Sequence, residues 1–584
     1  MTPEEFLREF GALAETEGAA DHLRALVLNL GATGQLVPAV EFSNSWFEEI
    51  RVVREDLLRS GFIERTKLPK QDELAQFVIP MPTHWALPRL DDVAYVVDPN
   101  PSHRNPEYVS DGFPFISTQE FYGTEGVRLD TPRRVAERTV IEQEKRCRFS
   151  QRSIAFSRKG TIGKTRLLPD VRFALLDSLC VVNPFAGVDE RFLAAILRSE
   201  IVAQQVRLMT RGLALPQISV GRVRLLRVPL PPPPEQKRIV EKVDQLMALC
   251  DELEAAQKKR RATSFLANKA ALSALTSATG TKPVKDAWKR VQDNFEVLYD
   301  APETVQDLRQ SILQLAVMGK LVRQDPRDEP AGKLLELASK VRIEELESGR
   351  PYAKRKAPDT PLAQREFELP DGWVWAWWHE VGLCQNGRAF PSSDYTIEGT
   401  RLLRPGNLHS SGRVTWTREN TRHLPDAYAV TFPEYIVGGN ELVMNLTAQS
   451  LKDDFLGRVC KTDRTEHALL NQRIARLTPL GLDRDYCRLA FSAPPYRRYV
   501  RGLNKGTLIQ HMFTSQVYES LLPVPPLSEQ ERIVAKVDQL MALCDELDTL
   551  LQRSRIDGEA LMKAVVEHLV AAPQAPSEPM AMVG

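Results

Sequence analysis

The stretch Glu235–Leu253, EQKRIVEKVDQLMALCDEL, decides the fold, because it recurs 294 residues later as Glu529–Leu547, EQERIVAKVDQLMALCDEL. Only two of the nineteen positions differ. A proline-rich segment precedes each copy, PLPPPP from Pro229 and PVPPLS from Pro523. Proline interrupts a strand ladder and favours the first turn of a helix. At both places we therefore expect a globular domain to end and a helix to begin.

Apolar residues in each copy are spaced 4, 3, 4, 3, which is typical of a coiled-coil seam. The seam residues are Ile239, Val243, Leu246, Cys250 and Leu253 in the first copy and Ile533, Val537, Leu540, Cys544 and Leu547 in the second. A helix from Glu235 to about Thr276 would be roughly 60 Å long at about 1.5 Å per residue. Because this is too long for one small domain to bury, we expect each helix to pack against its own repeat.

Two further repeats pair Leu23–Val37 with Leu308–Val322, and Pro82–Trp85 with Pro370–Trp373. The order of these markers is cyclic, so the N-terminal copy is placed to supply what the C-terminal half lacks. Between each tryptophan and the next proline-rich segment lies an insert of about 140 to 150 residues. The two inserts share little beyond an Arg-Gly-Leu, and their short apolar runs between Gly, Pro and Asn indicate mixed α/β domains.

We therefore predict an α+β fold in which two mixed α/β domains are separated by long paired, coiled-coil-like helices in a pseudo-twofold internal repeat. The predicted segments are an N-terminal helical segment over 1–80, a first domain over 81–228, a central repeat region with a long helix and linker over 229–368, a second domain over 369–522 and a C-terminal repeat helix over 523–584.

These features carry a family resemblance. The duplicated EQ block, the segment Asp293–Leu335 and ELPDGWVW at Glu368–Trp375 resemble the specificity subunits of type I restriction-modification enzymes. The resemblance implies two target recognition domains, each binding one half of a split, asymmetric site on double-stranded DNA. It also implies helices that set the spacing and dock two methyltransferase subunits, with restriction subunits joining the full complex. S-adenosylmethionine, ATP and Mg²⁺ would then belong to the partners, and the chain itself would be non-catalytic and hold no cofactor.

Three motif fragments were weighed against this interpretation. Gly163–Thr165 ends like a phosphate-binding loop, but Arg158 stands where that loop needs glycine. Pro494–Tyr496 is similar to an amino-methyltransferase motif, but Ala493 fills the position of its acceptor residue. The nuclease-like ExK at Glu235–Lys237 is absent from the second copy. Two alternatives stay open: a single-chain restriction-methylation enzyme, and a helical scaffold that binds protein rather than DNA.

Composition bounds the remaining choices. The 584-residue chain has a net charge of zero, and no run approaches the roughly 18 apolar residues of a membrane span. Its first residues do not resemble a signal peptide, so we expect a cytoplasmic protein. Seven scattered cysteines form no CxxC pair, which predicts reduced thiols and no metal site. Residues 145–228 nevertheless contain 16 Lys or Arg against 5 Asp or Glu, which favours a face that binds phosphates.

The candidate DNA-binding residues are cations, amides, hydroxyls and glycines near the ends of short predicted strands. In the first insert they are Arg158, Lys159, Gly160, Thr161, Gly163, Lys164, Arg211 and Gln217. In the second insert they are Asn407, Asn445, Arg501, Asn504, Lys505 and Thr507. The alternative for the glycines and asparagines is a simple turn. The cluster Trp373, Trp375, Trp377 and Trp378 could stack on bases, but its alternation predicts core packing.

Overall fold

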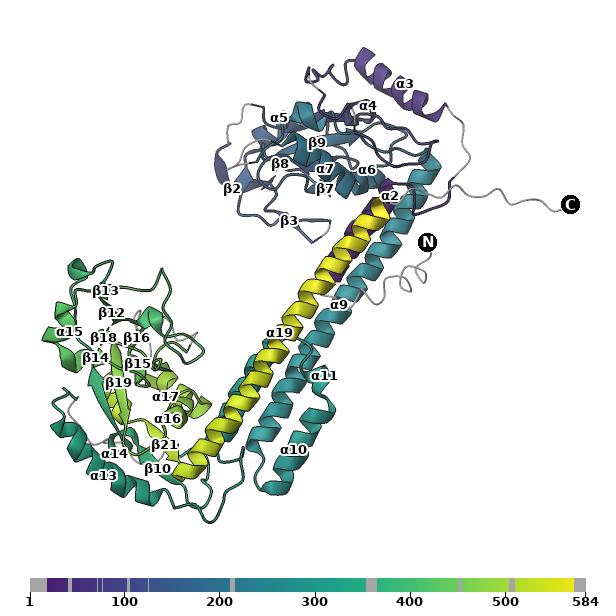
Figure 1. Ribbon diagram of the computed structural model, residues 1–584. Coiled ribbons are helices and arrows are strands. Elements are labelled where there is room, and N and C mark those ends of the chain that lie inside the picture. The colour runs from purple at the N-terminus through teal and green to yellow at the C-terminus, as the bar shows by residue number, and fades with distance from the viewer. Residues whose placement is uncertain are drawn as a thin grey trace. The chain divides into compact units, whose positions relative to one another are not determined.

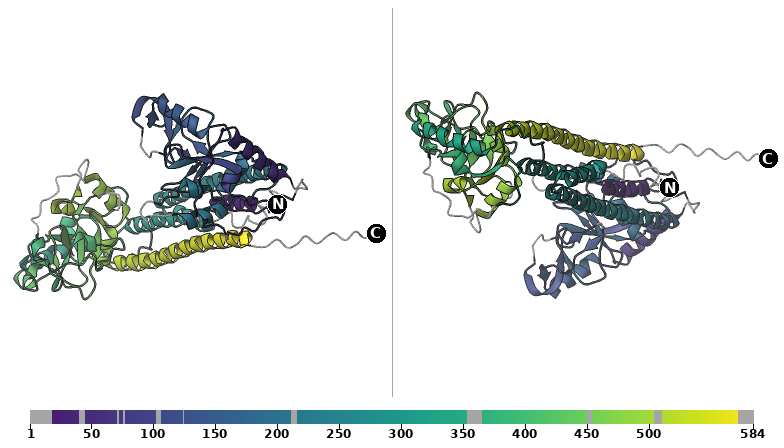
Figure 2. Two further views of the ribbon diagram at one scale, coloured as in Figure 1. Left: turned by 90° about the horizontal axis from the view of Figure 1, so that it is seen from above. Right: turned by 90° about the horizontal axis from the view of Figure 1, so that it is seen from below.

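The computed structural model describes residues 18–39, 45–70, 72–75, 77–101, 106–123, 125–210, 216–352, 365–449, 454–503 and 510–571. The chain divides into two compact units: unit 1 is Met1–Arg260 with Ser554–Gly584, and unit 2 is Arg261–Arg553. Two helices of 45 residues, α9 (Pro233–Ser277) and α19 (Leu527–Ala571), each contribute to both units and are unbroken in Figure 2. The predicted helix from Glu235 to about Thr276 is therefore confirmed.

Both long helices begin with the same hydrogen-bond pattern. The Gln236 side chain accepts from the amide of Asp189 at 2.8 Å and donates to the carbonyl of Pro231 at 2.9 Å. Gln530 makes the same two bonds, with the amide of Asp483 and the carbonyl of Pro525, both at 2.9 Å. The prolines end the preceding domain, and the glutamine then ties the helix start back to that domain.

Unit 1 holds the first globular domain. Its helices are α2 (Ala19–Ala32), α3 (Trp46–Arg59), α4 (Leu90–Val93), α5 (Glu137–Cys147), α6 (Glu190–Leu197), α7 (Glu200–Met209), α8 (Val220–Val223) and the first part of α9. Its strands are β1 (Ala94–Val97), β2 (Tyr108–Ile116), β3 (Phe121–Tyr122), β4 (Gly126–Val127), β5 (Arg134–Val135), β6 (Ile154–Ser157), β7 (Thr165–Leu167), β8 (Ala174–Leu175) and β9 (Leu179–Pro184). An antiparallel sheet has the order β1-β9-β6-β7, and a second sheet, β5-β2-β8, pairs β2 parallel to β8.

Unit 2 holds the second globular domain. Its helices besides the two long ones are α10 (Thr281–Asp293), α11 (Phe295–Leu298), α12 (Pro302–Val317), α13 (Gly332–Glu347), α14 (Trp378–Val381), α15 (Ala427–Thr431), α16 (Arg484–Ala490), α17 (Pro494–Leu503) and α18 (Thr514–Tyr518), with 3₁₀ turns η2 (Ser392–Asp394), η3 (Pro405–Asn407) and η4 (Pro433–Tyr435). Its strands are β10 (Val374–Trp377), β11 (Gly382–Asn386), β12 (Thr400–Leu403), β13 (His423–Leu424), β14 (Ile436–Val437), β15 (Leu442–Asn445), β16 (Thr447–Ala448), β17 (Val459–Lys461), β18 (Ala468–Leu470), β19 (Ile474–Pro479), β20 (Gln510–His511) and β21 (Leu521–Val524).

The two globular domains share one strand topology although their sequences differ. The main sheet of unit 2 has the order β11-β19-β15-β17, which corresponds strand for strand to β1-β9-β6-β7. The second sheet of unit 2, β13-β12-β18-β14, pairs β12 parallel to β18, as β2 pairs with β8. The registers agree as well, since Ala94 lies opposite Pro184 and Gly382 opposite Pro479. Mixed helices and sheets in both units confirm the predicted α+β class.

The seam of the first repeat packs in the core of unit 1 together with α2. Ile239, Val243, Leu246 and Cys250 are buried in one cluster with Leu23 and Leu26. Figure 1 shows α2 beside the start of α9, and a Cβ on Gly31 of α2 would lie 3.4 Å from the Ile239 side chain. Position 31 of α2 therefore faces the seam of α9 at van der Waals distance.

The second repeat packs in the same way in unit 2. Ile533, Val537 and Cys544 share a core cluster with Leu308 and Ile312 of α12. In each unit a short helix, α2 or α12, shares the core with the seam residues. Leu272 and Leu275, near the end of α9, also share the unit 2 core with residues of α19. Each seam is therefore buried in the core of its own unit.

Two of the four clustered tryptophans are core residues. Trp373 and Trp378 are buried, whereas Trp375 and Trp377 are half-buried. The core prediction is therefore confirmed for two indoles, but the alternating pattern is wrong. Strand β10 spans only Val374–Trp377, and the chain turns into α14 at Trp378, so alternation ends there.

Candidate nucleic-acid interface

The predicted glycine loop of the first domain connects β6 to β7. Gly160 and Gly163 have φ angles of 70° and 87°, a left-handed conformation that glycine adopts without a Cβ penalty. The hydroxyl of Ser157 donates to the carbonyl of Thr161 at 2.5 Å and accepts from the amide of Lys164 at 2.8 Å. Gly160, Thr161 and Lys164 are exposed, and a groove of about 440 Å³ lies between the loop and α7. The loop is thus a fixed, accessible turn.

Two predicted cations of this loop are held by carboxylates. The Arg158 side chain is 6% exposed and pairs with Asp98 at 2.8 Å. Lys159 pairs with Asp177, and its backbone forms a bridge with Gln217. These contacts fix the loop against the ends of β1 and β9. Lys164, by contrast, is exposed and, among the described residues, has no carboxylate at ion-pair distance.

Of the two remaining candidates in the first domain, the structure describes only Gln217. Gln217 is exposed and lies opposite Lys159 in the β-bridge. Arg211 lies outside the described residues. The exposed amide of Gln217 therefore joins the loop at one end of the sheet, and the role of Arg211 stays a prediction.

Asn407 and Asn445 of the second domain have internal structural roles. Both side chains are fully buried. Asn407 accepts from the amide of Arg404 at 2.9 Å, and Asn445 donates to the carbonyls of Thr447 and Phe455 at 2.8 and 2.9 Å. A base contact would require them to leave these bonds, and a buried polar group without a partner costs about 1–3 kcal/mol. The turn alternative accounts for both residues.

Arg501 is exposed near the end of α17 and pairs with Asp454 at 2.8 Å. Asn504, Lys505 and Thr507 lie outside the described residues, so these predictions are not placed. Pro494–Tyr496, weighed above as a methyltransferase-like fragment, begins α17, and the Tyr496 ring is buried. An aromatic residue enclosed in the core is not available to hold a flipped base.

Sequence reasoning missed a polar cluster at the corresponding end of the second domain. Arg388, Gln472, Arg473 and His511 are all exposed there. The amide of Gln472 donates to the carbonyl of Arg388, and the amide of Leu446 to the carbonyl of Arg473, both at 2.9 Å. Their proximity depends on pairings between distant strands, and no local spacing in the sequence signals it. The similarity to the first domain becomes visible only through the shared strand order.

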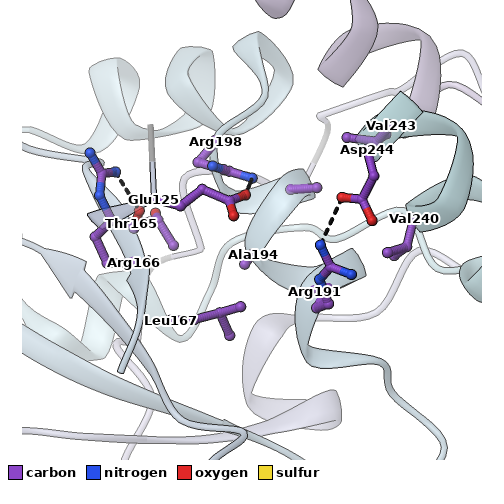
Figure 3. Close-up of a pocket in the computed structure, with 11 residues that line it drawn as sticks. Glu125, Thr165, Arg166, Leu167, Arg191, Ala194, Arg198, Val240, Val243 and Asp244 are labelled. Atoms are coloured by element: carbon purple, nitrogen blue, oxygen red, sulfur yellow. Dashed lines mark hydrogen bonds and ion pairs between the residues drawn. The ribbon is translucent and has the colours of Figure 1, made fainter. Parts of the chain in front are cut away.

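A cavity of about 100 Å³ lies between β7, α6 and α9 in unit 1 (Figure 3). Arg191 of α6 pairs with Asp244 of α9 at 2.8 Å, and Arg198 pairs with Glu125 at 3.3 Å. Arg166 donates to backbone carbonyls, and burial lowers the pKa of its guanidinium. Two carboxylates offset two of the three cations, so the cluster connects the domain to its helix and is not a strong anion site.

A tryptophan–glutamate contact joins the beginning and end of each globular domain. In unit 1 the Trp85 indole donates to Glu235 at 3.0 Å, and His84 contacts the other carboxylate oxygen at 2.9 Å. In unit 2 the Trp373 indole donates to Glu529 at 2.9 Å. Both carboxylates are buried, and burial raises the pKa of Glu529. The first glutamate of each repeat thus has a structural partner, which explains the ExK fragment without a metal.

Metal-ligand groups and cysteine thiols are two further features that the structure settles for the described residues. No group of three or more His, Cys, Asp or Glu side chains among them could hold a metal ion. All seven cysteines are buried free thiols, and burial raises the pKa of Cys180 to about 12. Within the described ranges, none of the helices combines the length and apolar character that crossing a bilayer requires.

Comparison with known proteins finds similarity to one family of DNA specificity proteins. Residues 82–263 match the family model described as the type I restriction modification DNA specificity domain. The chain is 27% identical over 562 residues to the EcoAI specificity subunit of Escherichia coli, which covers 91% of both chains. The chain is thus similar to type I restriction specificity subunits over most of its length. It is also 26% identical over 398 residues to the EcoEI specificity subunit of Escherichia coli, covering 63% of this chain and 65% of that one.

Among solved structures, the chain is similar to the HsdS subunit from Thermoanaerobacter tengcongensis. The two are 17% identical with a TM-score of 0.41, and the match covers 84% of this chain and 98% of that chain. A chain from a structure of a type I R-M system gives a TM-score of 0.44 at 17% identity, covering 87% of this chain and all of that one. The curated relatives are named as specificity subunits rather than as methyltransferases or nucleases.

Proposed function

We propose that the chain reads DNA for a type I restriction-modification complex, with each globular domain binding one half of a bipartite, asymmetric site. The observation that carries this proposal is that two domains of one strand topology differ in side chains, while their supporting helices share a nearly identical segment of nineteen residues. Equal scaffolds with unequal surfaces suit a site whose halves differ in sequence. The domain boundaries predicted above are part of this proposal.

The two long helices carry identical exposed residues in their repeated segment, which supports the docking of two copies of one methyltransferase subunit. Gln245, Ala248 and Glu252 of α9 are exposed, and the repeat keeps the same residue types at Gln539, Ala542 and Glu546, which are also exposed. Packing does not require identity at solvent-facing positions. Equivalent surfaces bind equivalent ligands, so a common partner explains the identity.

In this proposal the helices also set the distance between the half-sites. Adenine methylation and DNA cleavage lie with the methyltransferase and restriction subunits, which would bind S-adenosylmethionine, ATP and Mg²⁺. The chain's own role is to bind and orient DNA in the cytoplasm, without a catalytic step. Phosphate contacts would come from the basic segment 145–228, and base contacts from the strand ends described above.

The decisive experiment is single-molecule sequencing of methylated adenines in cells that express this chain with its neighbouring methyltransferase, compared with cells that lack the chain. We expect a split, asymmetric motif that disappears without the chain. An unchanged methylome would contradict the proposal. DNA affinity that does not fall with rising salt would instead favour a protein-binding scaffold, because phosphate contacts release counterions.

A further inference from the structure

The shared topology aligns the two domains residue by residue at one end of the main sheet. The β1–β9 and β11–β19 registers make Asp98 correspond to Asn386. The same registers make Asp177 and Ser178, just before β9, correspond to Gln472 and Arg473, just before β19.

Hydrogen bonds extend this correspondence past the strands. The amide of Arg158 donates to the carbonyl of Ser178 at 2.8 Å, and its carbonyl accepts from the amide of Ile218 at 2.9 Å. Leu446 makes the same two bonds, with Arg473 and Met512.

One residue further along, Lys159 forms a β-bridge with Gln217, and Thr447 pairs in the same way with His511. Six backbone positions are therefore common to both domains: 98 and 386, 158 and 446, 159 and 447, 177 and 472, 178 and 473, 217 and 511. We call these the tip positions.

The side chains at the tip positions differ in charge and in hydrogen-bonding pattern. In the first domain two ion pairs cross between strand ends, Asp98 with Arg158 and Asp177 with Lys159. In the second domain the equivalent pairs are uncharged, Asn386 with Leu446 and Gln472 with Thr447. The backbone frame is thus held constant while the groups it presents are exchanged.

Arg473 is the arginine among the tip positions of the second domain. Its side chain is exposed and, among the described residues, has no ion-pair partner. Arg401, Arg476, Arg498 and Arg501 each pair with a carboxylate. The Arg473 guanidinium supplies planar donors, and the neighbouring exposed amide of Gln472 supplies both a donor and an acceptor. Arginine pairs with two acceptors of guanine, and glutamine with two groups of adenine, in the major groove.

We infer that the tip positions other than the buried pair 158 and 446 are the specificity-determining positions of both domains, and that Arg473 reads a guanine in the half-site of the second domain. This inference rests on the proposed function and adds which side chains discriminate between bases. It also accounts for an asymmetric site, since equivalent positions carry ion pairs in one domain and neutral amides with one free cation in the other.

The test selects duplexes from a random DNA pool with the full chain in complex with its methyltransferase partner, followed by sequencing. Arg473→Ala should lower discrimination at one guanine position of one half-site by roughly 5- to 150-fold and leave the other half-site unchanged. Arg473→Lys should keep the affinity but still relax that position, because lysine lacks the planar fork. Asp177→Asn should alter only the half-site of the first domain.

The matched control is Arg498→Ala, which removes an exposed arginine of unit 2 away from the tip positions. It should change neither half-site. Because the Arg473 side chain is exposed, its variants should keep the wild-type melting temperature. Unchanged discrimination, or equal weakening at both half-sites, would overturn the inference while leaving the proposed function intact. Failure of the wild-type complex to enrich any bipartite motif would overturn both.

Discussion

Lys164 is the cation of the glycine loop best placed to meet a polyanion. Its side chain is exposed, whereas Arg158 and Lys159 on the same loop pair with Asp98 and Asp177. Lys164→Ala should weaken binding to unrelated DNA sequences about equally and reduce the slope of log affinity against log salt by about 0.9. The melting temperature of the Lys164→Ala variant should equal that of the wild type. Fluorescence anisotropy at several salt concentrations measures the slope, with Lys67→Ala, an exposed lysine outside segment 145–228, as the control; an equal effect in Lys67→Ala would remove the loop from the interface.

Arg158 behaves differently because its guanidinium is nearly enclosed. Removing it leaves the Asp98 carboxylate, whose side chain is 19% exposed, without its partner. Breaking a buried pair in this way costs up to about 3–5 kcal/mol, and partial exposure of Asp98 reduces the figure. A loss of DNA binding in Arg158→Ala would therefore mix folding with recognition, which makes Lys164 the better probe.

The buried carboxylate of Glu529 predicts a pH-dependent stability of unit 2. Burial raises its pKa above the usual value of about 4.5, despite hydrogen bonds from Trp373 and Gln324. Between the unfolded and folded pKa values the native state binds more protons, so this group makes stability fall as pH rises through that window. Urea unfolding at a series of pH values should show that Glu529→Gln removes this component.

The control is Glu531→Gln, which removes an exposed carboxylate two residues further along the same helix. It should leave the pH dependence of the free energy of unfolding unchanged. Parallel pH profiles for the wild type and Glu529→Gln would show that the carboxylate does not titrate differently on folding.

At this scale the sequence predicts residue types better than residue roles. The glycine loop was placed correctly at a strand end, because glycine and serine patterns have local causes. The ion pair of Arg158 is with Asp98, which lies 60 residues away in the sequence. Asn445 donates to the carbonyl of Phe455, which lies 10 residues away. Arg473 has no sequence signal at all, because its exposure depends on how β19 pairs with its neighbours.

The helices illustrate both the strength and the limit of periodicity. The 4, 3, 4, 3 spacing predicted a long helix and the face that it buries, and α9 and α19 have both. Periodicity does not identify what covers the buried face, and the short helices α2 and α12 contribute to that cover. Many strands have only two to four residues, too few for an alternating pattern to define.

Leu26 of α2 tests this cover. It is fully buried in the core that contains the α9 seam, and Leu26→Ala should destabilise unit 1 by about 2–5 kcal/mol. Val52→Ala on α3, where the side chain is 58% exposed, should cost less than about 0.5 kcal/mol. Chemical denaturation of the full chain compares them. Similar small losses in both variants would mean that α2 does not stabilise the seam, and removal of residues 1–80 would then leave unit 1 folded.

For the whole molecule, the duplicated sequence predicted two similar halves, and the structure extends the duplication to inserts that share almost no sequence. The common strand order of the two domains could not be predicted, because unlike side chains can satisfy the same backbone pairing. Recognition of the helical frame was therefore possible from sequence, whereas the correspondence of the inserts required the registers.

The proposed spacer role can be tested by shortening both long helices together. Residues 255–261 of α9 and 549–555 of α19 are mainly exposed and span the division between the units. Deleting seven residues from each removes two helical turns, or about 10.5 Å. The preferred gap between half-sites should then shorten by about three base pairs, with both half-site sequences retained. Methylome sequencing measures the gap; an unaltered gap would contradict the spacer role.

The tryptophan–glutamate contacts have a consequence for how such chains diversify. Trp85 lies near the entry to the first domain and Glu235 just after its exit, yet their side chains are 3.0 Å apart, and Trp373 and Glu529 repeat the arrangement. Each domain is therefore a cassette whose two ends meet at one hydrogen bond. Exchange of genetic material within the flanking repeats would replace everything between these residues and preserve the junction. A new DNA specificity could then arise in a single recombination event, without a gradual and unstable series of substitutions.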